Sequence, residues 1–419
     1  MQRPFSAICA ICGYLSLAGL GARAQDVLMP REDYSLTPPA VTQASTNQME
    51  VFTPPPAASP REAAPVNWGP VSLRPRLFYR FIYGNGIPAG GDYVKTAINE
   101  VSPGILMSIG SHWVLDYAPT WMLYTSSQLK NTVGQNASLT GGAVYGDWML
   151  EFSQSYVFSS DPQIQTGTQT DESVYLTLLR ATYHFNSRLT TDLAVDQKVV
   201  VADQFQSYKE WATLDWLNYD FYTRMQASIG LGGGYDAVQT GADMSFEQMQ
   251  ARFQWRATDK LSIRVNGGGE VRQYLQSDLN DTVSPVGGGQ IQYMPVDGTR
   301  ITLSADHIVN VSLLVVTNGG AGQSQLVEST DFAVGVQQRL LEHFTGNLGV
   351  GYHIVDYTTA GSTVSDRRDH YFDVDARVGT QFRRRGNFAI FYRYTNNNST
   401  DSGFTFNSNQ GGMQLEWRY

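Results

Sequence analysis

The chain has 419 residues, of which only 16% are charged, whereas glycine reaches 40 residues and aromatic residues 12%. Ordinary soluble domains carry about a quarter charged residues, so this composition is unusual for a soluble enzyme. The mean hydropathy is −0.26, and no apolar run of about 18 residues follows residue 24, which excludes membrane-spanning helices. The net charge of −9 argues against nucleic-acid binding, which requires a basic surface.

Residues 1–24 are typical of a signal peptide that directs export. Arg3 precedes an apolar stretch, and Ala22-Arg23-Ala24 supplies a small-x-small cleavage site. Both cysteines, Cys9 and Cys12, lie in this segment, and neither stands in a lipobox. The mature chain is therefore expected to have no cysteine, which excludes disulfides, thiolate metal sites and cysteine nucleophiles.

Residues 25–72 are predicted to form a proline-rich periplasmic tail before the first domain. The stretch from Gln25 to Pro75 holds ten of the 17 prolines, including Pro54-Pro55-Pro56. Proline removes backbone donors and keeps the chain extended, so we expect a semi-rigid tether here.

From residue 73 to residue 419 the chain alternates apolar and polar residues with period 2, as β-strands do. Met249, Ala251, Phe253 and Trp255, for example, alternate with polar or charged neighbours. Such alternation fits a β-sandwich as well as a membrane barrel, so the spacing of the turns has to decide between them.

Short and long connections alternate strictly along this region. Short turns are predicted at Ser111-His112, Gly146-Asp147, Asn186-Ser187, Asp220-Phe221, Thr258-Asp259, Asp297-Gly298, Glu342 and Arg385-Gly386. Long polar loops are predicted over Ser126–Ala137, Ser159–Asp171, Ala202–Ser207, Asp236–Asp243, Gln276–Val283, Thr317–Ser324, Thr359–Asp366 and Asn396–Ser402. Short turns on one rim and long loops on the other are typical of an outer-membrane barrel. We therefore predict an all-β fold, a transmembrane antiparallel up-and-down β-barrel over residues 73–419, with 18 strands and 16 as the alternative.

The apolar row of such a barrel faces lipid, and the polar row faces the lumen. The lumen-lining candidates are Arg224, Arg252, Arg256, Arg264, Glu270, Arg272, Arg300, Asp306, Asp331, Arg339, Asp373, Asp375, Arg377 and Arg383. Asp215 is assigned to the same inward rows. These charges either pair with one another across strands or form a ladder that selects solutes. Aromatic residues near strand ends are explained by belts at the two membrane interfaces.

Catalysis would need a constellation that the sequence does not display. The six histidines form no His-x-x-x-His pair, and no Gly-x-Ser-x-Gly elbow occurs. The pairs to inspect are His353 with Asp356 and His370 with Asp369. We expect no enzymatic activity, no cofactor and no metal, and a barrel-borne hydrolase is the lesser alternative.

Two stretches carry a resemblance to known proteins. The last strand, in which Met413, Leu415, Trp417 and Tyr419 alternate with polar residues, resembles the terminal signal read by the barrel-assembly machinery. The region from residue 73 onward resembles the outer-membrane β-barrel porins associated with exopolysaccharide loci. The residues that carry this second resemblance are Arg76–Phe81, Tyr83–Gly86, Tyr293–Pro295, Thr299–Leu303, Ser312, Gln338–Leu340 and Gly351-Tyr352.

That resemblance implies a protein of the bacterial outer membrane that passes or exports a polysaccharide. We therefore expect a passive pore or export conduit for hydrophilic solutes, an exopolysaccharide among them. Its expected partners are outer-membrane lipid, the barrel-assembly machinery, and polysaccharide or periplasmic export components, with no nucleic acid. The alternative is a non-conducting barrel that serves as a structural or assembly part of an envelope polysaccharide machine.

Overall fold

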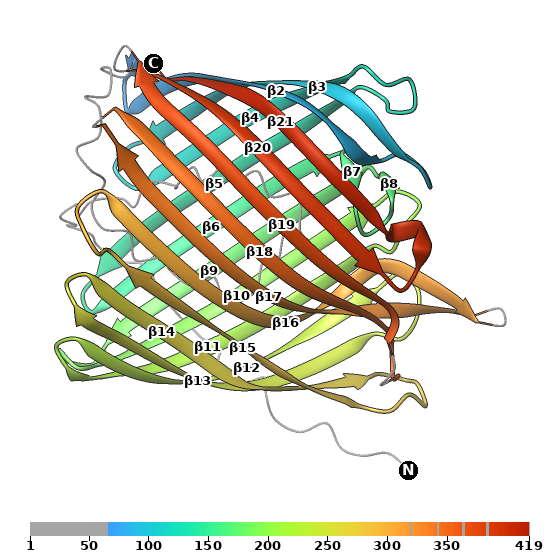
Figure 1. Cartoon of the computed structure of the whole chain (residues 1–419). Helices are drawn as coiled ribbons and strands as arrows, with labels where there is room; N and C mark the ends of the chain where they lie inside the picture. Colours follow the sequence, from blue (N-terminus) through green and yellow to red (C-terminus); the bar gives the residue numbers. More distant parts are fainter. Residues whose placement is uncertain (1–65, 319–320, 342, 363–364, 383–384, 419) are drawn as a thin grey trace.

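The computed structural model describes residues 66–318, 321–341, 343–362, 365–382 and 385–418 (Figure 1). The expected signal peptide, most of the expected tail, Arg383 and Tyr419 lie outside these residues. The strands are β1 (Val66–Trp68), β2 (Val71–Pro88), β3 (Tyr93–Ile109), β4 (Trp113–Tyr124), β5 (Thr132–Tyr145), β6 (Trp148–Ser159), β7 (Pro162–Gln163), β8 (Thr168–Gln169), β9 (Glu172–His184), β10 (Leu189–Ala202), β11 (Tyr208–Tyr222), β12 (Met225–Val238), β13 (Met244–Thr258), β14 (Leu261–Tyr274), β15 (Thr282–Tyr293), β16 (Thr299–Asn318), β17 (Ala321–Leu340), β18 (Phe344–Thr359), β19 (Ser365–Phe382), β20 (Gly386–Ser399) and β21 (Phe406–Arg418). One 3-10 turn, η1 (Ser402–Phe404), lies between β20 and β21. Among the described residues, no helix has the length and apolarity needed to span a membrane.

Eighteen of these strands form one closed antiparallel barrel, which confirms the predicted fold class and strand number. They are β2 to β6 and β9 to β21, and each pairs with its neighbours in the chain. The barrel closes where the first of them, β2, pairs with the last, β21, from Arg76↔Arg418 to Gly84↔Gln410. Closure matters because it leaves no unpaired strand edge in the wall.

The outer wall is apolar because one row of each strand points away from the lumen. Met249, Val265 and Ile229 are 61%, 50% and 56% exposed, although they lie in the middle of strands. Their neighbours Gln248, Gln250 and Asn266 are buried on the other side. An exposed apolar row in mid-strand suits hydrocarbon and would be unfavourable in water.

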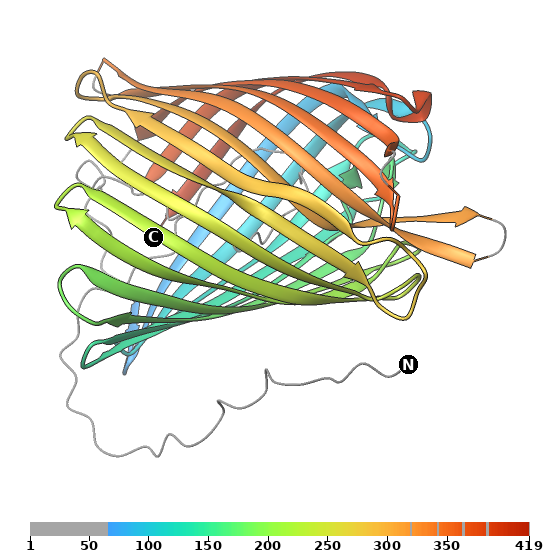
Figure 2. The same ribbon diagram turned by 90° about the horizontal axis from the view of Figure 1, so that it is seen from below.

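The two rims differ, as Figures 1 and 2 show. The turn rim, on the left of Figure 1, carries short connections such as 110–112 and 146–147, and the last strand ends there. The loop rim, on the right, carries the longer connections. The turn predicted at Asp220-Phe221 was placed too early, because β11 continues to Tyr222 and the turn falls at Thr223-Arg224.

Two predicted loops differ in the structure, and two short elements are added to the barrel. β16 and β17 run through the loop predicted over Thr317–Ser324 and project as a long hairpin beyond the loop rim (Figures 1 and 2), so that prediction was wrong. The loop predicted over Ser126–Ala137 is shorter, because β5 begins at Thr132. β1, within the expected tail, pairs with the start of β2. The small β7–β8 hairpin belongs to the connection between β6 and β9.

Candidate functional site

The inward rows place most predicted lumen residues in the barrel wall. Arg252, Arg264, Glu270, Arg272, Arg300, Asp306, Asp331, Asp373, Asp375 and Arg377 lie on strands β13 to β19, on the face opposite the exposed apolar row. Arg224 instead lies in the turn between β11 and β12 and pairs with Asp259 of the next turn, 3.1 Å away. Arg256 and Arg339 are exposed near strand ends at the same turn rim. These three arginines surround the turn-rim opening and do not line the middle of the lumen.

Many inward charges are paired across strands. Arg272 lies 2.8 Å from both Asp236 and Glu270, and all three are buried. Arg393 on β20 donates from Nε to Asp375 on β19 at 2.9 Å. Pairing neutralises charges that would otherwise be costly to bury. This arrangement matches the interpretation in which the charges pair with one another.

His353 bridges two aspartates on neighbouring strands. Its Nδ1 lies 2.5 Å from Oδ1 of Asp331 on β17, and its Nε2 lies 2.9 Å from Oδ1 of Asp373 on β19. The pairing with Asp356 considered from the sequence does not form, because Asp356 binds Arg368. With both ring nitrogens bound to carboxylates, His353 has no nitrogen left to act as a general base on a substrate.

The second candidate pair, His370 with Asp369, also does not form. Adjacent residues of a strand point to opposite faces, and the His370 ring contacts the hydroxyl of Tyr352 at 2.9 Å on the outer wall. Among the described residues, no group of three or more His, Asp or Glu side chains is arranged to hold a metal ion.

Asp215 is on the outer wall, contrary to its assignment to the lumen. It shares its row with the exposed residues Leu217 and Trp211, whereas Leu214 and Trp216 are buried on the inside. The ladder between β10 and β11 has no paired residues between Asp192↔Trp216 and Val195↔Thr213. Asp215 Oδ1 accepts the N–H of Ala194 in this gap at 3.0 Å. The carboxylate thus replaces a missing ladder bond, which the alternation pattern alone does not reveal.

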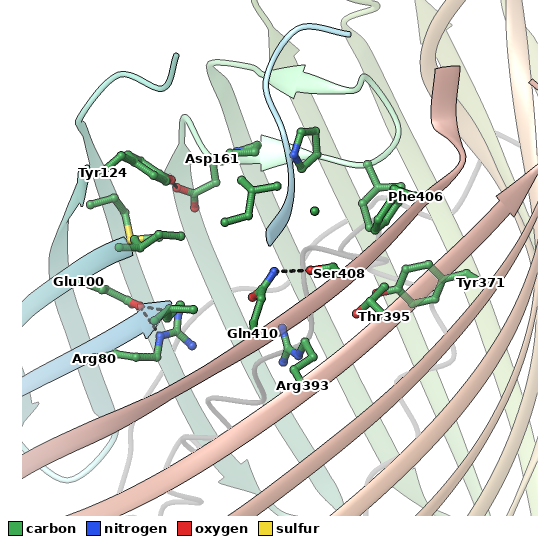
Figure 3. Close-up of a pocket in the computed structure, with 18 of the residues that line it drawn as sticks. Arg80, Glu100, Tyr124, Asp161, Tyr371, Arg393, Thr395, Phe406, Ser408 and Gln410 are labelled. Atoms are coloured by element: carbon green, nitrogen blue, oxygen red, sulfur yellow. Dashed lines mark hydrogen bonds and ion pairs between the residues drawn. The ribbon is translucent and has the colours of Figure 1, made fainter. Parts of the chain in front are cut away.

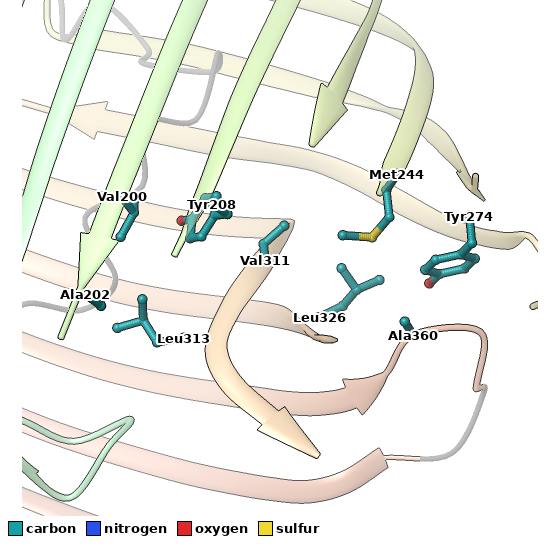
Figure 4. Close-up of a cluster of buried hydrophobic side chains, with 9 residues drawn as sticks. All are labelled: Val200, Ala202, Tyr208, Met244, Tyr274, Val311, Leu313, Leu326 and Ala360. Atoms are coloured by element: carbon teal, nitrogen blue, oxygen red, sulfur yellow. The ribbon is translucent and has the colours of Figure 1, made fainter. Parts of the chain in front are cut away.

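The lumen becomes apolar near the loop rim, where the sequence predicted polar rows. A mouth cluster of nine buried residues joins β10, β11, β13, β14, β16, β17 and Ala360, which directly follows β18, as Figure 4 shows. Its members are Val200, Ala202, Tyr208, Met244, Tyr274, Val311, Leu313, Leu326 and Ala360. β10 and β16 are separated by five strands in the sheet order, so the cluster connects distant parts of the wall.

A bulge in β16 makes this contact possible. The register of β16 against β17 shifts between Val311↔Leu326 and Val315↔Ser324, which gives β16 two extra residues. Within the bulge, Leu313 is buried in the mouth cluster and its carbonyl accepts the N–H of Gln206 at 2.8 Å. Bulges redirect side chains in this way at the rims of barrels.

The loop that contains β7 and β8 reaches across the mouth to the same bulge. Gln165 donates from Nε2 to Oγ of Ser312 at 2.6 Å, between two buried side chains. Its carbonyl accepts from Arg367 of β19 at 3.3 Å. The Arg367 guanidinium lies between the rings of Tyr357, at 3.7 Å, and Phe404, at 3.8 Å. We call residues 160–171 with these contacts the latch.

A cavity of about 270 Å³ lies beside the latch, against β2, β3, β20 and β21 (Figure 3). Arg80 of β2 and Glu100 of β3 face each other in register and form an ion pair. The cavity is also lined by Asp161 of the latch, by Arg393 of β20 and by Gln410 of β21. Figure 3 shows Arg80, Gln410 and Arg393 extending from the wall toward the same space.

The sequence alone predicts no role for Arg80, Glu100 or Asp161. The available signal was the alternation of Arg76, Phe78 and Arg80 with Leu77 and Tyr79, which places the first three on the inward row. The partners of that row could not be identified, because they depend on how the barrel closes and on where the latch folds.

These observations define the class of the protein. A closed antiparallel barrel with an apolar outer band, unequal rims and charged inward rows is the architecture of bacterial outer-membrane β-barrels. A family model described as "Putative beta-barrel porin 2" matches residues 236–419, from the end of β12 to the C-terminus. This match confirms the resemblance to outer-membrane porins that the sequence predicted.

Several solved structures match the chain at low identity and with TM-scores below 0.5. OpdK from Pseudomonas aeruginosa is 11% identical with a TM-score of 0.46, and OccK2 (OpdF) from the same organism is 8% identical with a TM-score of 0.47. Each comparison covers 83% of this chain and 98% of the other. The siderophore receptor PirA from Pseudomonas aeruginosa is 7% identical with a TM-score of 0.44, covering 83% of this chain and 80% of that one. No curated protein matches the chain.

Proposed function

We propose that the protein is an outer-membrane channel through which hydrophilic solutes diffuse passively. The observation that carries this proposal is the closed 18-stranded barrel with charged and polar residues along its inward rows. Barrels of about 16 to 18 strands are wide enough to leave an aqueous interior. The finer proposal, which rests on the family resemblance, is that the solute is a segment of an exopolysaccharide.

A non-conducting structural barrel is the second candidate. The mouth cluster and the latch both favour it, because they join distant strands across the loop rim. On the channel proposal, the latch has to move before a solute passes. No enzymatic role is proposed, since both nitrogens of His353 are bound to aspartates.

Planar-bilayer recording distinguishes the two candidates. The folded protein is first verified by heat-modifiable migration on a gel and then added to the bilayer. We expect stepwise conductance from the natural chain, and more frequent steps from Gln165→Ala, which removes the side-chain bond of the latch to Ser312. Silence from both folded proteins would exclude the channel and favour the structural barrel.

Efflux from vesicles tests the finer proposal. Vesicles that contain the protein are loaded with glucose oligomers of graded length, and release is followed with time. An export conduit for polysaccharide should release chains of several sugar units, whereas release of single sugars alone would contradict the polysaccharide role and leave the channel itself intact.

A further inference from the structure

The cavity beside the latch has one apolar side. Phe78, Ile98 and Met122 line it from the wall, and Phe406 and Ile164 line it from the loop-rim side. Phe406 is held in place by stacking on Tyr93, with ring centroids 4.9 Å apart. Apolar and aromatic lining with a few fixed polar groups is the usual composition of a small-molecule site.

The charges of the cavity are balanced before any ligand enters. The lining holds two cations, Arg80 and Arg393, and two carboxylates, Glu100 and Asp161. Arg80 is bound to Glu100 through two nitrogens, and Arg393 is bound to Asp375. An anionic ligand would have to compete with these carboxylates for the guanidinium groups, which opposes its binding.

The polar side of the cavity is held in a fixed arrangement. Gln410 donates from Nε2 to Ser408 at 3.0 Å, and Ser408 donates to the carbonyl of Asn85 at 2.6 Å. A primary amide has a second N–H and a carbonyl oxygen beyond this one bond. Groups that are already oriented lose little entropy when a ligand binds.

From this geometry we propose that the cavity is a binding site for an uncharged, polyhydroxylated solute with one apolar face, of which a hexose is the simplest example. The C–H face of the sugar ring packs on the apolar side, and its hydroxyls bond to Gln410 and to the Arg80–Glu100 pair. This inference names the solute class of the proposed channel and therefore rests on that function.

Calorimetry on the folded protein in detergent tests the site with D-glucose and D-glucuronate, which differ mainly in one carboxylate. We expect glucose to bind at least tenfold more tightly. Tighter binding of glucuronate would overturn the proposal, and so would the absence of glucose binding. Because this comparison uses the natural chain, it does not depend on whether any variant folds.

Variants on β21 locate the site. Gln410→Ala should weaken glucose binding about five- to tenfold, the loss expected for one net hydrogen bond. Gln414→Ala is the matched control, because Gln414 occupies the same inward row four residues further along the strand and does not line the cavity. Equal effects of the two substitutions would contradict the assigned location.

The same preparations are recorded in the planar bilayer. Conductance without glucose binding would overturn the sugar site and leave the channel standing. Glucose binding without conductance would overturn the channel and leave the sugar site standing.

Discussion

At the scale of single residues, glycines on the inner face of the wall make room for charged side chains of neighbouring strands. Gly351 of β18 faces the lumen beside His353, and a methyl group at Gly351 would overlap the Asp373 carboxylate and lie 2.6 Å from His353 Nε2. Gly288 makes similar room for Asp306. In each case a charged group from the neighbouring strand occupies the space that a side chain would need.

Gly351→Ala should therefore destabilise the barrel. The added methyl pushes the Asp373 carboxylate away from His353, and losing this partly buried bond costs about 1 to 3 kcal/mol in the free energy of unfolding. Urea unfolding in phospholipid vesicles measures the change. Gly335→Ala on the adjacent strand is the control, because a methyl group there meets no atom within 4 Å. Equal stability of the two variants would refute this role of Gly351.

Asp161 gives the latch a pH dependence. Burial raises the pKa of Asp161, the negative charge of Glu100 adds to the rise, and the Tyr124 hydroxyl and Arg80 oppose it, so that the resulting pKa is about 6. An exposed aspartate titrates near 3.9, so the docked latch binds more protons between these values. Docking is therefore strongest at acid pH and weakens as the pH rises through about 6.

We expect the open probability of the channel to rise between about pH 4 and pH 6 and then to level off. Asp161→Asn, which cannot ionise, should abolish this dependence within that window. Single-channel recording across the range measures both proteins. A natural chain and a variant with the same pH profile would show that Asp161 does not control the latch.

At the scale of elements, β16 changes function along its length. Its first half lies in the wall, paired with β15 and β17, whereas the bulge at Ser312–Leu314 contributes Leu313 to the mouth cluster and Ser312 as the anchor of the latch. Ser312 Oγ accepts bonds from Leu314 N–H and from Gln165. One irregular segment thus couples the wall to the loop that crosses the mouth.

Ser312→Ala should weaken the latch by about 1 kcal/mol, because Gln165 loses a buried acceptor. The expected result is a several-fold rise in open probability with the barrel still folded. Ser304→Ala on the inward row of the same strand is the control, since Ser304 lies between Gln290 and Ala333, far from the bulge. If the two variants have the same open probability, the bond between Gln165 and Ser312 has no role in gating.

The elements also show what the sequence could predict. The inward and outward rows of β13 and β19 follow local alternation, and the structure has the same rows. The latch could not be predicted, because Gln165 and Ser312 are 147 residues apart and local alternation does not show which loop crosses the mouth. The loop expected over 317–324 has Gly-rich sequence that is typical of a loop, yet the two strands continue through most of it.

At the scale of the whole molecule, closure of the barrel depends on a single junction between β2 and β21. The strand count was predictable because turns and loops alternate along the chain. The distance between the two end strands could not be predicted, because it depends on side chains from β2, β20 and β21 together. Gly412 lies at that meeting point, where a methyl group would overlap the carbonyl oxygen of Phe81 on β2.

Gly412→Ala should therefore hinder closure of the barrel. A backbone carbonyl cannot move aside without breaking the ladder between β2 and β21, so we expect a reduced yield of the heat-modifiable, folded form. Gly411→Ala is the neighbouring control, since its methyl group would lie 3.7 Å from the Phe391 carbonyl oxygen, an ordinary contact. Comparable folded yields would show that the junction tolerates added bulk.

The mouth cluster has a consequence for the order of assembly. Its residues come from β10 to β17 and from Ala360 after β18, and they meet only when the wall has curved into a ring. If the long loops cross the membrane first, as in barrels inserted from the periplasm, these apolar side chains remain apart until the circle is nearly complete. We expect the mouth to be the last region to become ordered, so that any opening of the loop rim in the mature protein retraces the final step of its biogenesis.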